Sequence, residues 1–248
     1  GIKRLEYRGY DSVGMATLHD EVITIKKDVG DVGNVNAKLN FLDLKGNMGM
    51  AHTRWATCGG VTQINAHPHM SCDGKIAVVH NGIIENYEEL KKKLESEGCI
   101  FVSQTDTEII PHYFERKLKE GKDIYETIAD FMHDIKGTFA ILMIVEGDDK
   151  LYAIKRDSPL VLGIGKGEFY AASDIYAFSE LTNKAIFFDN DEAAIIDAQG
   201  YLFFDAKGNM LNKEITQFEW SEPKEEKKYT HYMLKEIMEE PVVLKRML

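Results

Sequence analysis

One polar stretch, residues 51–59, gathers side chains that could bind a small charged substrate. It places Arg54, Trp55 and Thr57 beside a Gly-Gly pair. Binding groups concentrate in loops that a rigid scaffold positions, so the stretch is a candidate site. A packed tryptophan with a guanidinium stacked on it is the purely structural alternative.

Two further motifs could complete such a site. Asn81 and Gly82 end an apolar run, where a side-chain amide and a backbone N–H could both donate to a developing negative oxygen. A tight turn is the alternative explanation for Asn-Gly. Residues 105–108 (Thr-Asp-Thr-Glu) form a further polar motif that includes Asp106, although a helix N-terminal cap would explain the same residues.

Metal binding and thiol catalysis are weaker interpretations of the polar residues. Cys58, His67, His69 and Cys72 lie within fifteen residues, but their spacing matches no common structural zinc module. Cys58 and His67 could form a nucleophile and base pair, but a Cys and a His often occur in one loop by coincidence. We therefore expect no metal and no cofactor, and keep a zinc-stabilised domain as an alternative.

Composition limits the classes of function. The 248 residues include 30 Lys and Arg against 41 Asp and Glu, a net charge of −11. Such a charge disfavours nucleic-acid binding. The longest apolar run, residues 139–145, is far shorter than the roughly 20 residues that span a bilayer. Three cysteines are too few for a disulfide framework, and we expect a reducing, cytoplasmic location.

The elements that must position these motifs are mixed helices and strands in the first half of the chain and mainly strands in the second half. A strand over 75–80 and a helix over 86–98, with Asn86 as its N-cap, are followed by a strand over 100–103 and helices over 106–120 and 123–135. The second half predicts a meander of antiparallel strands. Together they indicate an α+β layered sandwich. The meander strands are expected at 138–145, 150–155, 160–164, 169–172, 185–188, 193–196 and 202–204.

The composition shifts after residue 220. Residues 221–228 are polar and charged, which is typical of a linker, and helix-like spacing returns from Tyr229. We therefore expect a domain over 1–220 and the start of a second domain within 221–248.

Several long motifs, in order, resemble the glutaminase domain of the glutamine:fructose-6-phosphate aminotransferases (isomerizing), the glucosamine-6-phosphate synthases. The resemblance spans nearly the whole chain, and the last motif resembles the entry into that family's sugar-isomerase half. The motifs are residues 4–12, 54–57, 65–69, 79–86, 103–108, 157–160 and 229–237.

The resemblance implies an N-terminal-nucleophile hydrolase fold, an αββα sandwich of antiparallel sheets. It implies hydrolysis of glutamine to glutamate, with the ammonia passed to fructose 6-phosphate to give glucosamine 6-phosphate. Arg54 would bind the α-carboxylate of glutamine and Asp106 its α-ammonium. Asn81 and Gly82 would stabilise the tetrahedral oxyanion.

Four more residues take roles from the same resemblance. Trp55 would act as a lid or channel gate, Thr57 and His67 would line or brace the glutamine loop, and Arg8 would lie near the nucleophile. Cys58 stands where most relatives carry His.

The nucleophile is the main departure from the family pattern. The family uses an N-terminal Cys whose α-amino group serves as base, whereas position 1 here is Gly. We expect the sequence to be the retained part of a longer enzyme, without its first strand and inactive as it stands. The partner expectations are a sugar-isomerase domain in the same full-length chain, a homodimer, and neither nucleic acid nor membrane. The alternative is a non-catalytic glutamine-binding regulatory module that has lost the nucleophile.

Overall fold

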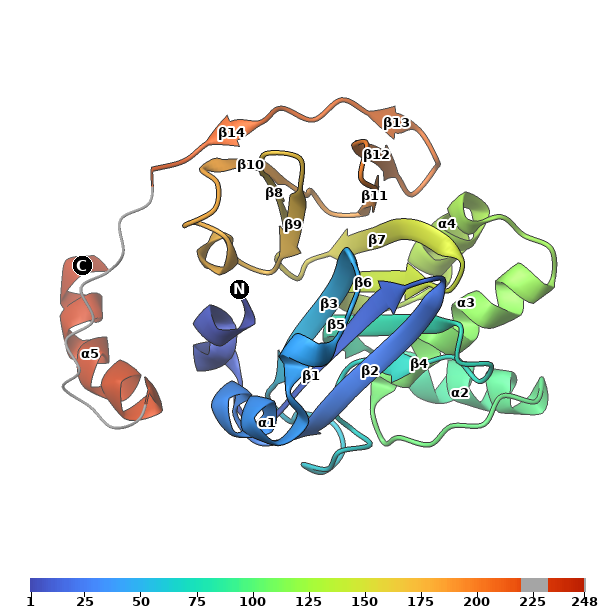
Figure 1. Ribbon diagram of the computed structural model, residues 1–248, viewed down its shortest axis with the longest axis horizontal. Helices are drawn as coiled ribbons and strands as arrows, with labels where there is room; N and C mark the ends of the chain where they lie inside the picture. Colours follow the sequence, from blue (N-terminus) through green and yellow to red (C-terminus); the bar gives the residue numbers. More distant parts are fainter. Residues whose placement is uncertain (220–231, 248) are drawn as a thin grey trace. The chain divides into compact units, whose positions relative to one another are not determined.

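Residues 1–219 and 232–247 are described in the computed structural model of this chain (Figure 1). The chain divides into two units, Gly1–Phe218 and Glu219–Leu248, and each is considered by itself. The second unit contains helix α5 (Tyr232–Met247), which includes Pro241. The linker expected over 221–228 lies outside the described residues. Within the described ranges, no helix has the length and apolar character needed to cross a membrane.

A seven-stranded antiparallel sheet forms the centre of the first unit. Successive side chains of its inner strands point to opposite faces of the sheet, and both faces are buried. This explains the near-continuous apolar runs in the sequence. In spatial order its strands are β13 (Met210–Leu211), β12 (Tyr201–Asp205), β11 (Glu192–Ile196), β7 (Asp148–Arg156), β6 (Gly137–Val145), β5 (Ile76–Ile84) and β4 (His69–Met70).

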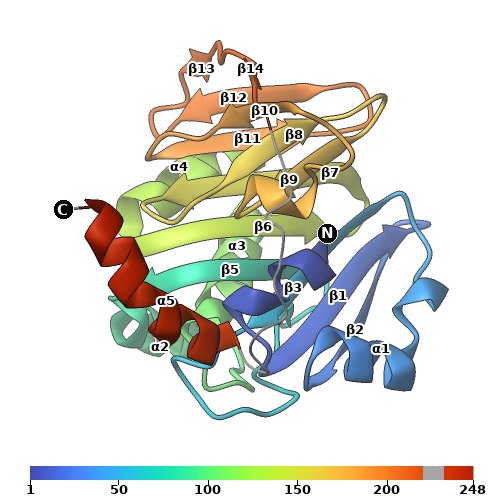
Figure 2. The same cartoon turned by 90° about the vertical axis from the view of Figure 1, so that its left-hand side faces the viewer.

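Three helices cover one face of this sheet (Figure 2). Buried aromatic side chains, among them Phe114 and Phe131, pack on Ile141 and Tyr152 of the sheet. Full burial of side chains of this size contributes about 1.5–3 kcal/mol each, so this layer is the main core. The helices are α2 (Tyr87–Ser96), α3 (Ile109–Lys119) and α4 (Ile124–Asp134).

Two smaller antiparallel sheets cover the other face. The first has the order β2-β1-β3 and the second the order β14-β10-β8-β9. The apolar contacts run through Leu18 and Val79 for the first sheet and through Leu162 and Ala194 for the second. Their strands are β1 (Ser12–His19), β2 (Val22–Val29), β3 (Met48–Arg54), β8 (Val161–Ile164), β9 (Phe169–Ala172), β10 (Lys184–Phe187) and β14 (Thr216–Gln217).

Helix α1 (Val32–Leu39) supplies the fourth layer. Asp31 caps it by accepting a hydrogen bond from the Asn34 backbone N–H at 3.0 Å, and Val35 packs on Val13 of β1. The expected αββα layering of antiparallel sheets is therefore confirmed. Short 3-10 helices complete the unit: η1 (Ile2–Arg8), η2 (Phe41–Asp43), η3 (Asp106–Glu108) and η4 (Ile175–Ala177).

Two predictions for residues 86–103 are wrong. The strand expected over 100–103 is irregular, because the Val102 and Ser103 N–H groups donate to the Glu108 carboxylate at 2.8 and 2.7 Å instead of to a neighbouring strand. Asn86 does not cap α2 with its side chain. Its amide instead donates to the Asp134 carbonyl and accepts from the Lys136 N–H.

The helix expected over 106–120 has two parts, because η3 precedes α3. Thr105 forms no side-chain cap at the start of η3. In contrast, the capping box at Asp123 and Glu126 of α4 is confirmed, with the Glu126 N–H donating to Asp123 Oδ1 at 2.8 Å.

Candidate active site

Arg54 ends strand β3 and organises the loop that follows. Its buried guanidinium donates to the carbonyls of Cys58, Gly59 and Gly60, the last at 3.2 Å. The loop is also tied back by the Ala56 N–H, which donates to Asp11 Oδ2 at 2.9 Å. The cation is therefore fixed in position beneath the loop that carries Trp55 and Thr57.

Asn81 and Gly82 lie in the exposed part of β5. Asn81 Oδ1 lies 2.8 Å from Nε2 of His52 on β3. Gly82 has φ +132°, and a Cβ there would lie 2.0 Å from the Thr138 carbonyl oxygen, so only glycine fits. The oxygen of the Asn81 amide is thus engaged within the protein, which directs the amide NH₂ away from His52.

Three buried histidines, His67, His69 and His80, and the half-buried His52 surround this arrangement. The rings of His52 and His67 stack with centroids 4.2 Å apart, and His69 meets His67 edge-on at 4.9 Å. His67 Nδ1 accepts from the His80 backbone N–H at 3.3 Å. We call these four residues the histidine cluster.

Burial keeps the histidine cluster neutral. Removal from water lowers the pKa of His52 to about 4 and that of His69 to about 3, and it also lowers the pKa values of His67 and His80. A neutral His52 whose Nε2 faces an amide oxygen carries its proton on Nε2 and donates to Asn81. The cluster can therefore orient donors but supplies no charge near neutral pH.

Asp106 is buried at the start of η3. Its Oδ2 accepts from the Ile84 N–H at 2.8 Å, which ties η3 to the end of β5. The Asp106 and Asp11 carboxylates both act electrostatically on the Arg54 guanidinium, opposing the burial that lowers the pKa of Arg54. Asp106 thereby supplies a fixed anion that interacts electrostatically with the fixed Arg54 cation.

The histidine cluster reinforces that placement. His69 Nε2 lies 3.0 Å from Thr105 Oγ1, and His80 Nδ1 lies 3.0 Å from Thr107 Oγ1. The two threonines flank Asp106, so the cluster fixes the segment that carries the carboxylate.

The remaining predicted residues are more exposed. Trp55 is 42% exposed, and its ring meets that of Tyr10 edge-on at 5.7 Å. Thr57 is exposed. Arg8 at the end of η1 forms an ion pair with Asp174 at 2.8 Å.

A cavity of about 370 Å³ lies between β3 and β9. Each of these strands is the last in its sheet, so each turns an unpaired edge toward the cavity. Both Figure 2 and the lining residues put the chain start, Gly1 and Ile2, at this gap. Of the predicted site residues, Arg8 and Asn81 line the cavity, and the following do not: Arg54, Trp55, Thr57, His67, Gly82 and Asp106.

The zinc alternative over Cys58, His67, His69 and Cys72 is wrong. In the part of the chain that the structure describes, the metal-ligand groups that come together are Cys72, Cys99 and His112. His67 and His69 belong to the histidine cluster, and Cys58 Sγ contacts the Gln104 carbonyl at 3.3 Å.

Sequence reasoning missed His52 as a site residue. One signal was available, because His52 and Arg54 are two residues apart on one strand and such residues share a face of the sheet. The pairing of His52 with Asn81, however, depends on contact between separate sheets, which spacing does not reveal.

Comparison with known proteins identifies the family. A model of the glutamine amidotransferase domain matches residues 52–180. The glutamine–fructose-6-phosphate aminotransferases (isomerizing) of Thermococcus kodakarensis and Methanothermobacter thermautotrophicus are 46% and 48% identical to this chain over 99% and 97% of its length. The chain spans 41% of the length of each of these relatives.

The fold comparison agrees. The glutamine phosphoribosylpyrophosphate amidotransferase of B. subtilis, complexed with ADP and GMP, has a TM-score of 0.72 and 25% identity, covering 84% of this chain and 45% of that one. The expected N-terminal-nucleophile type of fold is thereby confirmed. With the family model matching more than half of its residues, this chain belongs to the glutamine amidotransferase domain family.

Proposed function

We propose that this chain is the glutaminase half of a glutamine:fructose-6-phosphate aminotransferase. It would hydrolyse glutamine and pass the ammonia to fructose 6-phosphate, giving glutamate and glucosamine 6-phosphate. The observation that carries the proposal is the Asn81–Gly82 pair, an amide oriented by His52 beside a backbone position that accepts only glycine. The choice of fructose 6-phosphate as acceptor comes from the names of the relatives that are 46–48% identical to this chain.

Asn81 and Gly82 would act on the transition state of amide hydrolysis. Attack on the side-chain carbonyl of glutamine makes a tetrahedral oxyanion, which the Asn81 amide and the Gly82 N–H would stabilise. Because His52 holds the Asn81 oxygen, the amide needs no reorganisation when the charge develops. Preorganised donors of this kind are usually the largest catalytic term.

Arg54 and Asp106 would recognise the free amino acid. Glutamine carries an α-carboxylate and an α-ammonium, so its site requires one fixed cation and one fixed anion. Arg54 is held under the loop by three carbonyls, and Asp106 by the Ile84 N–H. Trp55 and Thr57, on the exposed loop above Arg54, would close over the bound substrate, and His67 would brace them from below.

The cavity between β3 and β9 would receive the catalytic strand. The family resemblance implies an N-terminal Cys nucleophile, at the start of a strand that is not among these 248 residues. Two unpaired edges and a largely apolar lining suit one additional strand, which would join the two small sheets into one. Asn81 and Arg8 line the same cavity, so the nucleophile would lie beside the oxyanion donors.

The longer protein would add the acceptor half. The sugar-isomerase domain would follow α5 in the same chain, and we extend the proposal to a homodimer of that chain. All three cysteines are free thiols, which suits a reducing cytoplasm.

The full-length enzyme tests the proposal directly. We expect glutamine-dependent formation of glucosamine 6-phosphate, and replacement of the N-terminal Cys by Ala should abolish glutamate release while free ammonia still supports synthesis. Asn47→Ala, on an exposed residue outside the site, is the matched control for Asn81→Ala. Glutamine binding without glutamate release from the intact enzyme would overturn the proposal in favour of a regulatory module.

A further inference from the structure

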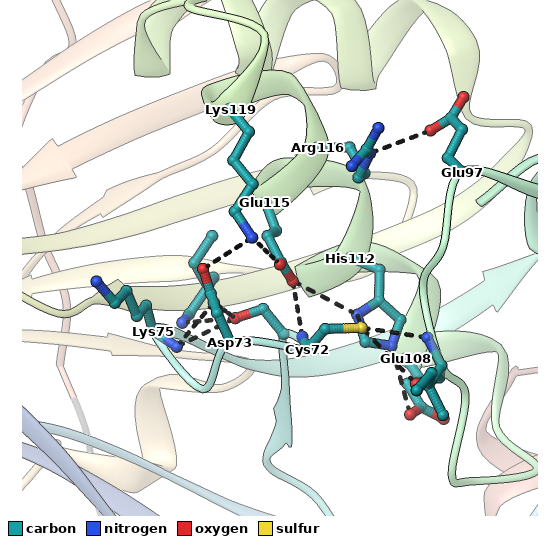
Figure 3. Close-up of polar contacts among 12 residues, drawn as sticks. Cys72, Asp73, Lys75, Glu97, Glu108, His112, Glu115, Arg116 and Lys119 are labelled. Carbon is teal, nitrogen blue, oxygen red and sulfur yellow. Dashed lines mark hydrogen bonds and ion pairs between the residues drawn. The ribbon is translucent and has the colours of Figure 1, made fainter. Parts of the chain in front are cut away.

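Three potential metal ligands from separate segments meet on the helical side of the central sheet. Cys72 follows β4, Cys99 follows α2, and His112 lies in α3. One ligand atom of each lies within 4.8 Å of the other two. Figure 3 shows Cys72 and His112 of this thiol–imidazole cluster pointing toward one another, with Glu108 and Glu115 beside them.

The distances suit a small tetrahedral ion. Cys72 Sγ lies 3.5 Å from Nδ1 of His112. Zinc bonds of about 2.3 Å to sulfur and about 2.0–2.1 Å to nitrogen, at tetrahedral angles, separate those two atoms by roughly 3.6 Å. The S–N pair therefore already has the spacing that a shared zinc ion would impose.

Glu108 prepares the imidazole as a ligand. Its carboxylate accepts from the Val102 and Ser103 N–H groups and from the Ser103 hydroxyl, at 2.6–2.8 Å, which keeps it an acceptor. Oε1 lies 3.5 Å from Nε2 of His112, a buried nitrogen with no other polar partner among the described residues. This favours a proton on Nε2 and leaves the Nδ1 lone pair facing Cys72. Carboxylate–histidine pairs orient metal-binding histidines in the same way.

The sulfur of Cys72 is held in place as well. The Ile100 N–H donates to Cys72 Sγ at 3.2 Å, which fixes the sulfur beside His112. Cys72 is exposed, whereas Cys99 and His112 are buried. The cluster thus offers an entry from solvent and an interior that holds the ion.

We propose that Cys72, Cys99 and His112 bind a zinc ion. Two thiolates and one imidazole are the donor set that zinc prefers among the common divalent ions. Glu115, whose carboxylate lies 4.0 Å from Nδ1 of His112 and accepts from the Cys72 N–H, is the nearest candidate for the fourth position, which water could also fill. The ion would join β4, α3 and the segment that leads to Asp106.

Zinc uptake by the whole protein, purified under reducing conditions without a histidine tag, tests the proposal. We expect one zinc ion per chain by elemental analysis after removal of free metal. Cobalt in place of zinc should give the thiolate charge-transfer absorption of tetrahedral sites. Both signals should be lost in Cys72→Ser and His112→Asn, with folding checked by circular dichroism.

Cys58→Ser is the matched control, since it removes the cysteine outside the cluster and should retain the zinc and the cobalt spectrum. Zinc should also raise the Tm of the wild type but not that of Cys72→Ser. Failure of the reduced wild type to take up zinc, or equal uptake by Cys72→Ser, would overturn the proposal. A Cys72–Cys99 disulfide in the native protein, with no zinc bound after reduction, would do the same and assign the thiols a redox role.

Discussion

Histidine has opposite surroundings in two regions of this protein. In the histidine cluster, the rings of His52 and His67 stack, His69 meets His67 edge-on, and each of the four residues has a side-chain or backbone hydrogen-bond partner. In the thiol–imidazole cluster, the Nδ1 of His112 faces a sulfur. Imidazoles whose ring nitrogens contact hydroxyl, amide or backbone groups position those groups, whereas one that faces a thiol is available to a ligand. The residue type alone does not distinguish these roles, but the partners do.

The largest expected effect is on the group that the histidine cluster orients. Asn81→Ala in the full-length enzyme should lower kcat for glutamine hydrolysis about 10²–10³-fold, because one oxyanion donor is lost, with little change in KM. Steady-state glutamate release measures this. An unchanged kcat would mean that the cluster orients a residue with no part in the reaction.

Acid should destabilise the histidine cluster. The folded pKa of His52, about 4, lies below its unfolded value of about 6.5, so the unfolded state binds the proton first as pH falls. The free energy of unfolding should therefore be highest above pH 6.5 and should fall progressively toward pH 4. His52 alone accounts for a decrease of up to about 3 kcal/mol. Urea unfolding across this range should show the decrease. A His52→Gln variant should show a smaller slope, and an equal slope would contradict the assignment.

The segment braced by His69 and His80 carries the proposed ammonium contact. Asp106→Asn should raise the KM for glutamine about tenfold to a hundredfold, since a charge-assisted bond of about 1.5–3 kcal/mol is weakened. The fold should persist, because an asparagine oxygen can still accept from the Ile84 N–H. Steady-state kinetics give the KM for glutamine of this variant and of the control Asp149→Asn, which changes an exposed residue. Equal KM values in both variants would remove Asp106 from the site.

The smallest expected effect compares the two regions directly. Without metal, His69→Asn should be more destabilising than His112→Asn by about 1 kcal/mol. The His69 change removes a hydrogen bond of 3.0 Å to the buried Thr105 hydroxyl, whereas the His112 change removes only longer contacts of 3.5 Å with Cys72 Sγ and Glu108 Oε1. Both residues are buried and receive the same substitution, so the comparison reports the difference between their polar contacts. Parallel urea titrations give both free energies of unfolding. The reverse order would mean that His112 is also a structural residue.

Local pattern predicted most of the fold. The α4 capping box, the antiparallel strands of the second half and the αββα layering follow from periodicity, turn residues and the family resemblance. The single meander expected there is wrong, because β8, β9 and β10 form a separate sheet with β14 and β7 pairs with β11. The strand expected over 100–103 is wrong because the Glu108 carboxylate takes the N–H groups of Val102 and Ser103. A side chain that satisfies the backbone removes the need for a partner strand, and propensity cannot detect this.

The candidate site was only partly predictable from the sequence. Arg54, Asn81 and Asp106 lie in motifs whose residue types already suit glutamine. His52 acquires its importance only from contact with Asn81, and Cys99 only from contact with Cys72 and His112. Contacts between segments far apart in the sequence decide both cases, and residue spacing carries no information about them.

The unpaired edges of β3 and β9 also affect how the protein behaves in solution. Exposed strand edges pair readily with strands from other molecules, and natural proteins normally cover or interrupt them. Molecules that present these edges to solvent should therefore self-associate through edge-to-edge pairing. Light scattering at increasing concentration would show this, and a covalently joined strand that fills the gap should keep the protein monodisperse.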